Sequence, residues 1–226
     1  MIKAVCFDLF FTLITPEYGK INNEFDLLGI SREEWERYAE EPSLYRERAL
    51  GTVDSEIEII DKIAAITPFE ISAAQRQKVL EARRERMRAA LQNVSDDITS
   101  VLEILKKKGI QIGLISNADR IDCRYWKESK LFSFFDEAVF SCDVGLLKPD
   151  IHIYELAMRR LGVPPEICLF VGDGGSDELY GAKSAGMKTV FSEALEVKDD
   201  ESRSRIMAYA DHHIKNFREI LSCIGE

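Results

Sequence analysis

The feature that most constrains this chain is a short apolar segment, residues 2–7, that ends in a single carboxylate, Asp8. A continuous apolar run of this length is typical of a strand buried on both faces, as in a parallel sheet. Open α/β sheets bind ligands at the carboxyl ends of their strands, where the strand order reverses. The segment therefore predicts a buried strand that delivers Asp8 to a ligand-binding edge. The alternative is an aspartate that only terminates the strand.

Strand and helix patterns alternate from residue 95 onward. Ser95 is expected to cap a helix that stops at Gly109, and Asp150 to cap another. Apolar strand patterns occupy residues 110–115, 138–140, 167–171, 188–191 and, as a shorter segment, 213–214. This alternation predicts an α/β fold with a doubly wound parallel sheet.

Residues 16–91 have helical periodicity instead. Three helices are expected there, one opened by Ser31 and limited by Pro42, one starting at residues 52–56, and one over residues 72–91. So many helices exceed an ordinary crossover between two strands. We therefore predict a helical cap subdomain at 16–91, inserted into an α/β core of residues 1–15 and 92–226.

Composition excludes several classes of protein. The chain has 226 residues and a formal net charge of −10, which disfavours nucleic acid or an anionic membrane as a partner. No apolar stretch reaches the roughly 18 to 20 residues of a membrane span, and no secretory signal is visible, so a cytoplasmic location is expected. Five scattered cysteines indicate neither a disulfide framework nor a zinc site. Arg83, Arg84, Arg86 and Arg88 are interpreted as one solvated helix face.

Polar residues stand at or just beyond the carboxyl ends of the predicted strands. The set comprises Asp8, Ser116 with Asn117, Lys148, and Asp173 with Asp177 and Glu178. In a parallel sheet these positions share one rim and can converge on one pocket. One lysine among several carboxylates suits the binding of an anion together with a divalent cation.

These segments resemble the four ordered motifs of the haloacid dehalogenase-like hydrolase superfamily. The matching segments are residues 8–13, 116–117, 148–150 and 172–177. The resemblance covers nearly all of the core and places residues 16–91 where the family inserts its helical cap. It implies a Rossmann-like core and hydrolase activity.

The resemblance also implies catalytic roles. Asp8 matches the nucleophile that forms a covalent aspartyl intermediate, Ser116 the hydroxyl that binds the transferring group, and Lys148 the cation that holds nucleophile and substrate together. Thr12 and Asn117 are implied to contact substrate beside Ser116 and Lys148. A carboxylate is a weak nucleophile, so positioning and charge neutralisation must supply most of the catalysis.

The implied cofactor is Mg²⁺. Its ligands would be the side chains of Asp8 and Asp173 and the backbone carbonyl of Phe10, with waters and a substrate oxygen. Asp177 matches the second acidic position of the last motif and is also expected to cap the following helix, although its neighbour Glu178 is an alternative for the metal.

Phe10 is the main departure from the family pattern. The family's phosphatases carry a second aspartate there, a general acid that typically contributes ~10² to 10⁴-fold. Phe11 also replaces the usual glycine. An aromatic residue at position 10 resembles the metal-independent 2-haloacid dehalogenases, but these replace the Gly-Asp pair that is intact here as Gly172 and Asp173.

The leading hypothesis is a Mg²⁺-dependent hydrolase of a small phosphorylated metabolite. The alternatives are a metal-independent 2-haloacid dehalogenase and a binding protein that keeps the fold without turnover. Cap residues are expected to set substrate specificity, and candidates at the cap entrance are Glu17, Tyr18, Tyr45 and Arg46. A monomer or weak homodimer is the default expectation for the assembly.

Overall fold

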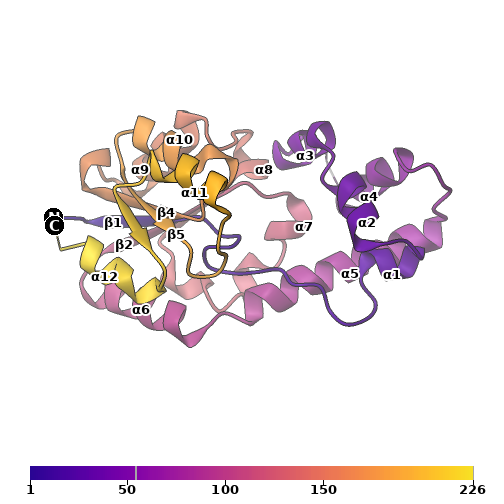
Figure 1. The fold of residues 1–226 in the computed structure, drawn as a ribbon, viewed down its shortest axis with the longest axis horizontal. Coiled ribbons are helices and arrows are strands. Elements are labelled where there is room, and N and C mark those ends of the chain that lie inside the picture. The colour runs from indigo at the N-terminus through magenta and orange to yellow at the C-terminus, as the bar shows by residue number, and fades with distance from the viewer. Residues whose placement is uncertain (54, 226) are drawn as a thin grey trace.

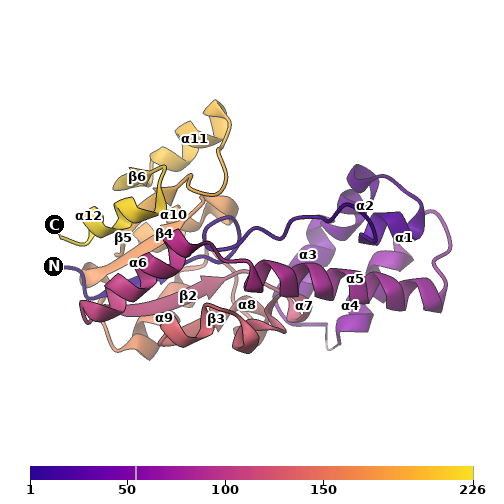
Figure 2. The ribbon, with the colours of Figure 1, turned by 90° about the horizontal axis from the view of Figure 1, so that it is seen from below.

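The structure is a computed structural model that describes residues 1–53 and 55–225. Figures 1 and 2 show two parts: one contains the sheet and both chain termini, and the other consists of helices α1–α4. The long helix α5 runs from the helical part toward the sheet. No helix in the described residues is long and apolar enough to cross a membrane.

Six parallel strands form one sheet in the order β3-β2-β1-β4-β5-β6. The strands are β1 (Ala4–Phe7), β2 (Gln111–Ser116), β3 (Glu137–Phe140), β4 (Cys168–Gly172), β5 (Lys188–Ser192) and β6 (His212–Ile214). Phe7 at the end of β1 is in register with Leu114 of β2 and Val171 of β4. The predicted parallel α/β sheet is confirmed. The strand order reverses at β1, so Asp8 follows the strand at the switch point.

Helices cover both faces of the sheet (Figure 1). Helices α6 (Asp96–Lys107) and α12 (Ile220–Cys223) lie on one face, and α9 (Ile151–Leu161) and α10 (Glu178–Ser184) on the other. The alternation along β1 explains why both faces need cover. Val5 and Phe7 pack in one apolar cluster, whereas Ala4 and Cys6 pack in the other.

The helical part has an apolar cluster of its own, centred on Trp35 and Ile59. Its helices are α1 (Glu24–Leu28), α2 (Arg32–Ala39), α3 (Pro42–Ala49), α4 (Glu56–Ala65) and α5 (Ala73–Gln92). Ser31 caps α2, as the sequence predicted; α5 falls within the helix predicted at 72–91, and the structure adds that Ser72 caps it. The predicted start at 52–56 falls at Glu56, and Asp54 lies outside the described residues. The subdomain boundaries at 15/16 and 91/92 remain a prediction.

Several short helices were not predicted. Helix α3 begins at Pro42, which we expected only to end a helix; proline is tolerated at the first helical position because no N–H is needed there. The other unpredicted helices are α1 (Glu24–Leu28), α7 (Arg120–Cys123), α8 (Ser141–Val144) and α11 (Asp200–Met207). Single 3₁₀ turns occur at Trp126–Glu128, Phe132–Phe134, Pro165–Ile167, Gly175–Asp177 and Phe217–Glu219.

Candidate active site

Asp8 lies directly after β1 and is buried. Its backbone N–H donates to the carbonyl of Val171, which continues the β1–β4 pairing by one residue. Lys148, just ahead of α9, places its Nζ 2.5 Å from Asp8 Oδ1 and 2.5 Å from Glu178 Oε2. Thr12 is also buried, and its hydroxyl lies 3.4 Å from Asp8 Oδ2. The turn after β1 therefore holds Asp8 between a cation and a hydroxyl.

Three buried carboxylates meet at this edge of the sheet. Oxygens of Asp8, Asp173 and Glu178 all lie within 4.8 Å of one another. Glu178 is the first residue of α10, and its Oε1 accepts the N–H of Gly174 at 3.0 Å. A Cβ at Gly172 would lie 2.0 Å from that same oxygen, so glycine is required there. We refer to the carboxylates of Asp8, Asp173 and Glu178 together as the carboxylate site.

The structure corrects the prediction for Asp177. Its side chain is exposed, makes no capping hydrogen bond to α10, and is not part of the carboxylate site. Ser176 and Asp177 both adopt left-handed backbone conformations, with φ of 52° and 49°. These two residues extend the turn after Gly174, so that Glu178 rather than Asp177 faces inward. The alternative that the sequence left open for the second acidic position is the one that the structure favours.

Ser116 and Asn117 follow β2. The hydroxyl of Ser116 is buried and has no hydrogen-bond partner among the described residues. Asn117 lines the pocket, but its side chain is engaged: Oδ1 accepts the N–H of Lys148 at 2.8 Å, and Nδ2 donates to the Lys148 carbonyl at 3.2 Å. Asn117 therefore fixes the backbone of Lys148, a function that the sequence did not predict.

Lys198 is a second cation beside the carboxylate site. It lies in the loop after β5, and its Nζ is 2.5 Å from Asp173 Oδ2 and paired with Glu196. The sequence did not predict this contact, because no motif marks the loop and 25 residues separate Lys198 from Asp173.

Burial sets the charge states of the site. Burial raises the pKa of Asp8; Lys148 opposes this, and Asp173 adds to it. Burial, followed by the charge of Asp8, raises the pKa of Glu178 well above its usual range. Burial lowers the pKa of Lys148, but the carboxylates of Asp8 and Glu178 outweigh this and raise it. The raised pKa values mean that ionisation of Asp8 and Glu178 is not fully compensated by Lys148, which favours the entry of a further cation.

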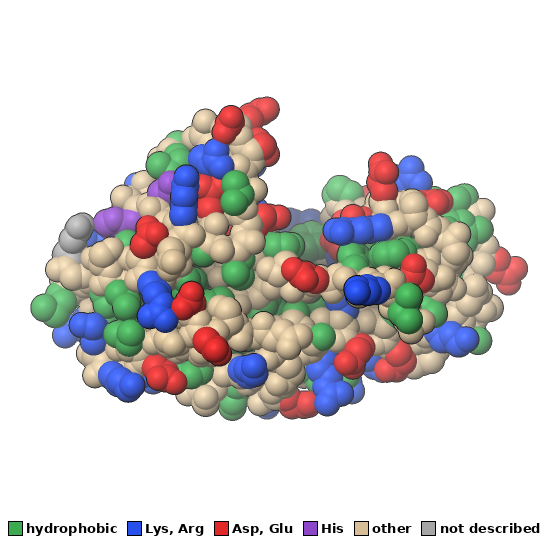
Figure 3. Space-filling model, turned by 60° about the horizontal axis from the view of Figure 1, so that its bottom comes forward, with side chains coloured by type: hydrophobic (Ala, Val, Ile, Leu, Met, Phe, Trp, Pro, Cys, Tyr) green, Lys and Arg blue, Asp and Glu red, His purple; other side chains and the backbone are tan. Residues whose placement is uncertain are grey.

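A pocket of about 920 Å³ opens over the carboxylate site and extends to the helical part. Figure 3 shows the surface hollowed between the two parts. The predicted cap residues Glu17, Tyr18 and Tyr45 line this pocket, and Phe10 lines it from the core. The prediction for Arg46 is wrong, because its side chain is exposed and does not line the pocket. Arg48, two residues further along the same helix, lines the pocket instead.

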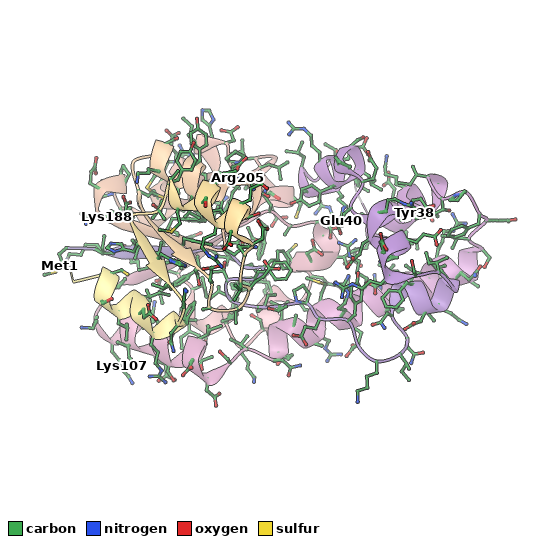
Figure 4. The ribbon with its side chains drawn as sticks, in the orientation of Figure 1. Met1, Tyr38, Glu40, Lys107, Lys188 and Arg205 are labelled. Carbon is green, nitrogen blue, oxygen red and sulfur yellow. The ribbon has the colours of Figure 1, made fainter. Side chains whose placement is uncertain are left out.

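A second group of charged residues, of which Arg48, Arg83 and Asp119 are buried, joins the helical part to the core. Arg48 and Arg83 each donate to Asp119 Oδ2 at 2.7 Å, and Arg48 also donates to Glu40 at 2.6 Å. Figure 4 shows Glu40 on the side of the helical part that faces the core. Arg83 also contacts Asp122 at 2.9 Å. We call Glu40, Arg48, Arg83, Asp119 and Asp122 the bridging cluster.

The interpretation of the α5 arginines as one solvated face is therefore wrong for most of them. Arg83 is buried in the bridging cluster, while Arg84 pairs with Glu56 and Arg86 with Glu24. Only Arg88 of the four is mostly exposed. The carboxylates that pair with these arginines come from distant segments, so helical spacing alone could not reveal them.

Comparison with protein families matches residues 2–186 to the haloacid dehalogenase-like hydrolases. A glyceraldehyde 3-phosphate phosphatase of Methanothermobacter thermautotrophicus is 40% identical over 107 residues, 45% of this chain and 46% of the relative. An (S)-2-haloacid dehalogenase 4A of Burkholderia cepacia is 34% identical over 131 residues, 55% of this chain and 56% of the relative. The chain thus spans about half the length of these curated relatives.

Solved structures extend the similarity to the whole chain. A crystal structure of a phosphatase of this family from Thermococcus onnurineus is similar with a TM-score of 0.63 and 25% identity, covering 99% of this chain and 98% of that one. The family match, the parallel sheet and the order of the four motifs agree. This chain belongs to the haloacid dehalogenase-like hydrolases.

Proposed function

We propose that this hydrolase is a Mg²⁺-dependent phosphatase of a small phosphorylated metabolite, with Asp8 as its nucleophile. The observation that carries the proposal is the carboxylate site itself: Asp8, Asp173 and Glu178 converge at the switch point of the sheet, with Lys148 between two of them. Relatives named as phosphatases support the same reaction class.

The donor set suits Mg²⁺. Carboxylate oxygens are hard ligands of the kind that Mg²⁺ prefers. One oxygen from each of the three carboxylates lies within 4.8 Å of the other two, close enough for all three residues to bind the same ion. Asp8, Asp173, Glu178 and the carbonyl of Phe10 would hold the ion. When bound, it would neutralise charge on substrate oxygens and on the nucleophile.

The surrounding residues position the reaction. Lys148, fixed through Asn117, holds Asp8 at one oxygen and leaves the other to attack phosphorus. A bond then forms between that oxygen and phosphorus as the bond to the leaving oxygen breaks, and water later hydrolyses the aspartyl phosphate. The hydroxyl of Ser116 lacks a partner, so it is available to donate to a phosphoryl oxygen.

Phe10 limits the leaving groups. Its ring lines the pocket and cannot transfer a proton, so an alkoxide leaving group would depart without the acid that typically contributes ~10² to 10⁴-fold. The leaving groups of aryl and acyl phosphates, an aryloxide and a carboxylate, depart without protonation. We therefore expect a marked preference for leaving groups of low pKa.

The test is the rate of Mg²⁺-dependent hydrolysis of 4-nitrophenyl phosphate against an alkyl phosphate such as glycerol phosphate. We expect the aryl ester to turn over at least about 100-fold faster than the alkyl ester. Asp8→Asn should abolish both activities while remaining folded. Equal rates for Asp8→Asn and the wild type would refute the role of Asp8.

A 2-haloacid dehalogenase is the second candidate, favoured by Phe10 and by the relative of that name. Halide leaves without a proton, so the lack of a general acid at Phe10 would not slow this reaction. Chloride release from 2-chloropropionate that a chelator does not affect would establish this reaction in place of the phosphatase. No release from a panel of 2-haloacids would exclude it.

A further inference from the structure

We propose that Lys198 is a tethered competitor of Mg²⁺, whose ammonium group occupies the Asp173 oxygen that the metal needs. This inference rests on the proposed metal-dependent function and adds to it a residue that sets metal affinity. The expected consequence is a lower Mg²⁺ affinity than the three carboxylates alone would give.

The contacts of Asp173 carry the argument. Its Oδ1 accepts the N–H of Gly175 at 3.1 Å, and its Oδ2 lies 2.5 Å from Lys198 Nζ. Both oxygens of this carboxylate are therefore engaged. The other two carboxylates share Lys148, so every member of the carboxylate site already contacts an ammonium group.

The two cations exclude each other at this oxygen. A magnesium ion would sit about 2.1 Å from Asp173 Oδ2, in the space next to an ammonium group 2.5 Å from the same atom. Like charges at such a separation repel strongly in a partly buried site. To bind Asp173 through Oδ2, Mg²⁺ must therefore displace Lys198, and the energy of the Lys198–Asp173 pair is subtracted from the binding energy of the metal.

The loop offers Lys198 an alternative partner. Glu196 pairs with the same ammonium group, and its side chain is 40% exposed. The backbone of Lys198 is held separately, because its N–H donates to Glu193 Oε1 at 2.8 Å. The side chain can thus move onto Glu196 alone while the loop stays anchored. Glu196 is the group that would retain the displaced ammonium.

The test is Mg²⁺ binding to the full chain, measured by isothermal titration calorimetry with magnesium chloride and no substrate. Lys198→Met should bind Mg²⁺ about tenfold more tightly than the wild type, since the competitor is gone. Lys183→Met is the matched control: this lysine pairs with Asp211 at 2.8 Å, on the exposed side of α10. The control should bind as the wild type does, which separates a local effect from a change in net charge.

Glu196→Gln supplies the opposite perturbation. Without Glu196, displaced Lys198 has no carboxylate to move to, so Mg²⁺ binding should weaken by about threefold or more. In the Lys198→Met background the same substitution should have little effect, because no ammonium group remains to be retained. A Glu196→Gln effect of equal size in both backgrounds would mean that Glu196 acts on Mg²⁺ directly, and would overturn the mechanism.

Other outcomes also decide the question. Equal Mg²⁺ affinity in Lys198→Met and the wild type would overturn the competition but leave the phosphatase proposal intact, provided that Asp173→Asn abolishes binding. Absence of Mg²⁺ binding in every variant would refute both the competition and the metal-dependent function. Weaker binding in Lys198→Met, with an unchanged thermal melting curve, would show that Lys198 supports the metal instead.

Discussion

The carboxylate site and the bridging cluster both pair buried carboxylates with cationic side chains, but the pKa of Asp119 in the bridging cluster shifts in the opposite direction to the pKa values of Asp8 and Glu178. In the bridging cluster, Asp119 accepts two guanidinium groups through Oδ2 and the backbone N–H groups of Ile121 and Asp122 through Oδ1. Burial opposes its ionisation, yet Arg83 and Arg48 outweigh this and lower its pKa. At the carboxylate site, burial prevails and raises the pKa of Asp8 and Glu178.

The difference separates a structural use of buried charge from a reactive one. Asp119 is satisfied by groups of the fold, so its charge stabilises the native state. Asp8 and Glu178 share one lysine, so ionisation of both leaves negative charge that a proton or a further cation must neutralise. Instability of this kind is typical of active sites, where binding of a ligand supplies the missing interaction.

The largest effect should come from removing the shared cation. Lys148→Met leaves the buried carboxylates of Asp8 and Glu178 without their shared cation, and we expect the free energy of unfolding to fall by about 3 kcal/mol at pH 7. Because the pKa values of Asp8 and Glu178 are already raised, these groups should take up protons as the pH falls, and the loss should shrink. Urea unfolding at pH 5 and pH 7 measures both. Lys107→Met, on an exposed face of α6, is the control; an equal loss there would remove the contrast.

Another buried carboxylate, that of Glu193, extends the comparison. The side chains of Arg203 and His213 and the backbone N–H of Lys198 all contact Glu193. Hydrogen bonds from Arg203, acting against burial, lower the pKa of Glu193 from 4.5 to about 2. Its contribution to stability is therefore fully present above pH 4.5 and lost as the pH falls toward 2.

Glu193→Gln should accordingly lower the free energy of unfolding by about 2 kcal/mol at neutral pH. The difference from the wild type should narrow between pH 4.5 and 2, as measured by denaturant unfolding across that range. A difference that grows on acidification would place Glu193 with the carboxylate site instead.

The smallest effect on stability is expected at Asp177, which we compare with its neighbour in the sequence, Glu178. Asp177→Asn changes an exposed side chain and keeps a residue that tolerates the left-handed backbone, so stability should shift by less than about 0.5 kcal/mol. Mg²⁺ affinity should also be unchanged. Glu178→Gln should instead weaken Mg²⁺ binding strongly, as measured by calorimetry. The reverse ranking would restore Asp177 as the metal-binding residue.

The sequence was a good guide where local pattern determines structure. The apolar run before Asp8, the strand patterns of the core and the helix-opening Ser31 are local signals, and the structure contains the elements they predict. Short helices such as α7 and α8 depend on tertiary contacts more than on periodicity, which explains their absence from the prediction.

Unusual backbone conformations and long-range contacts explain the errors at the site. The position of Asp177 depends on two consecutive residues with left-handed backbone conformations, which the sequence does not predict, so the motif spacing indicated the wrong carboxylate. Lys198 reaches Asp173 from a loop without a motif. The partner of Arg83 is Asp119, 36 residues away, so a helical wheel of α5 could not distinguish this buried arginine from the exposed Arg88.

The unfolding free energies of Asp8→Asn and Asp119→Asn, compared in one denaturant series without added Mg²⁺, test the central distinction most directly. Asparagine keeps the capping acceptor at position 119 but removes the negative charge that pairs with Arg48 and Arg83. We expect the free energy of unfolding to fall by about 3 kcal/mol. A carboxyl group whose pKa is raised by folding destabilises the native state above that pKa, so Asp8→Asn should be neutral or stabilising by up to about 1 kcal/mol. An equal loss in both variants would contradict the account, because Asp8 would then be as structural as Asp119.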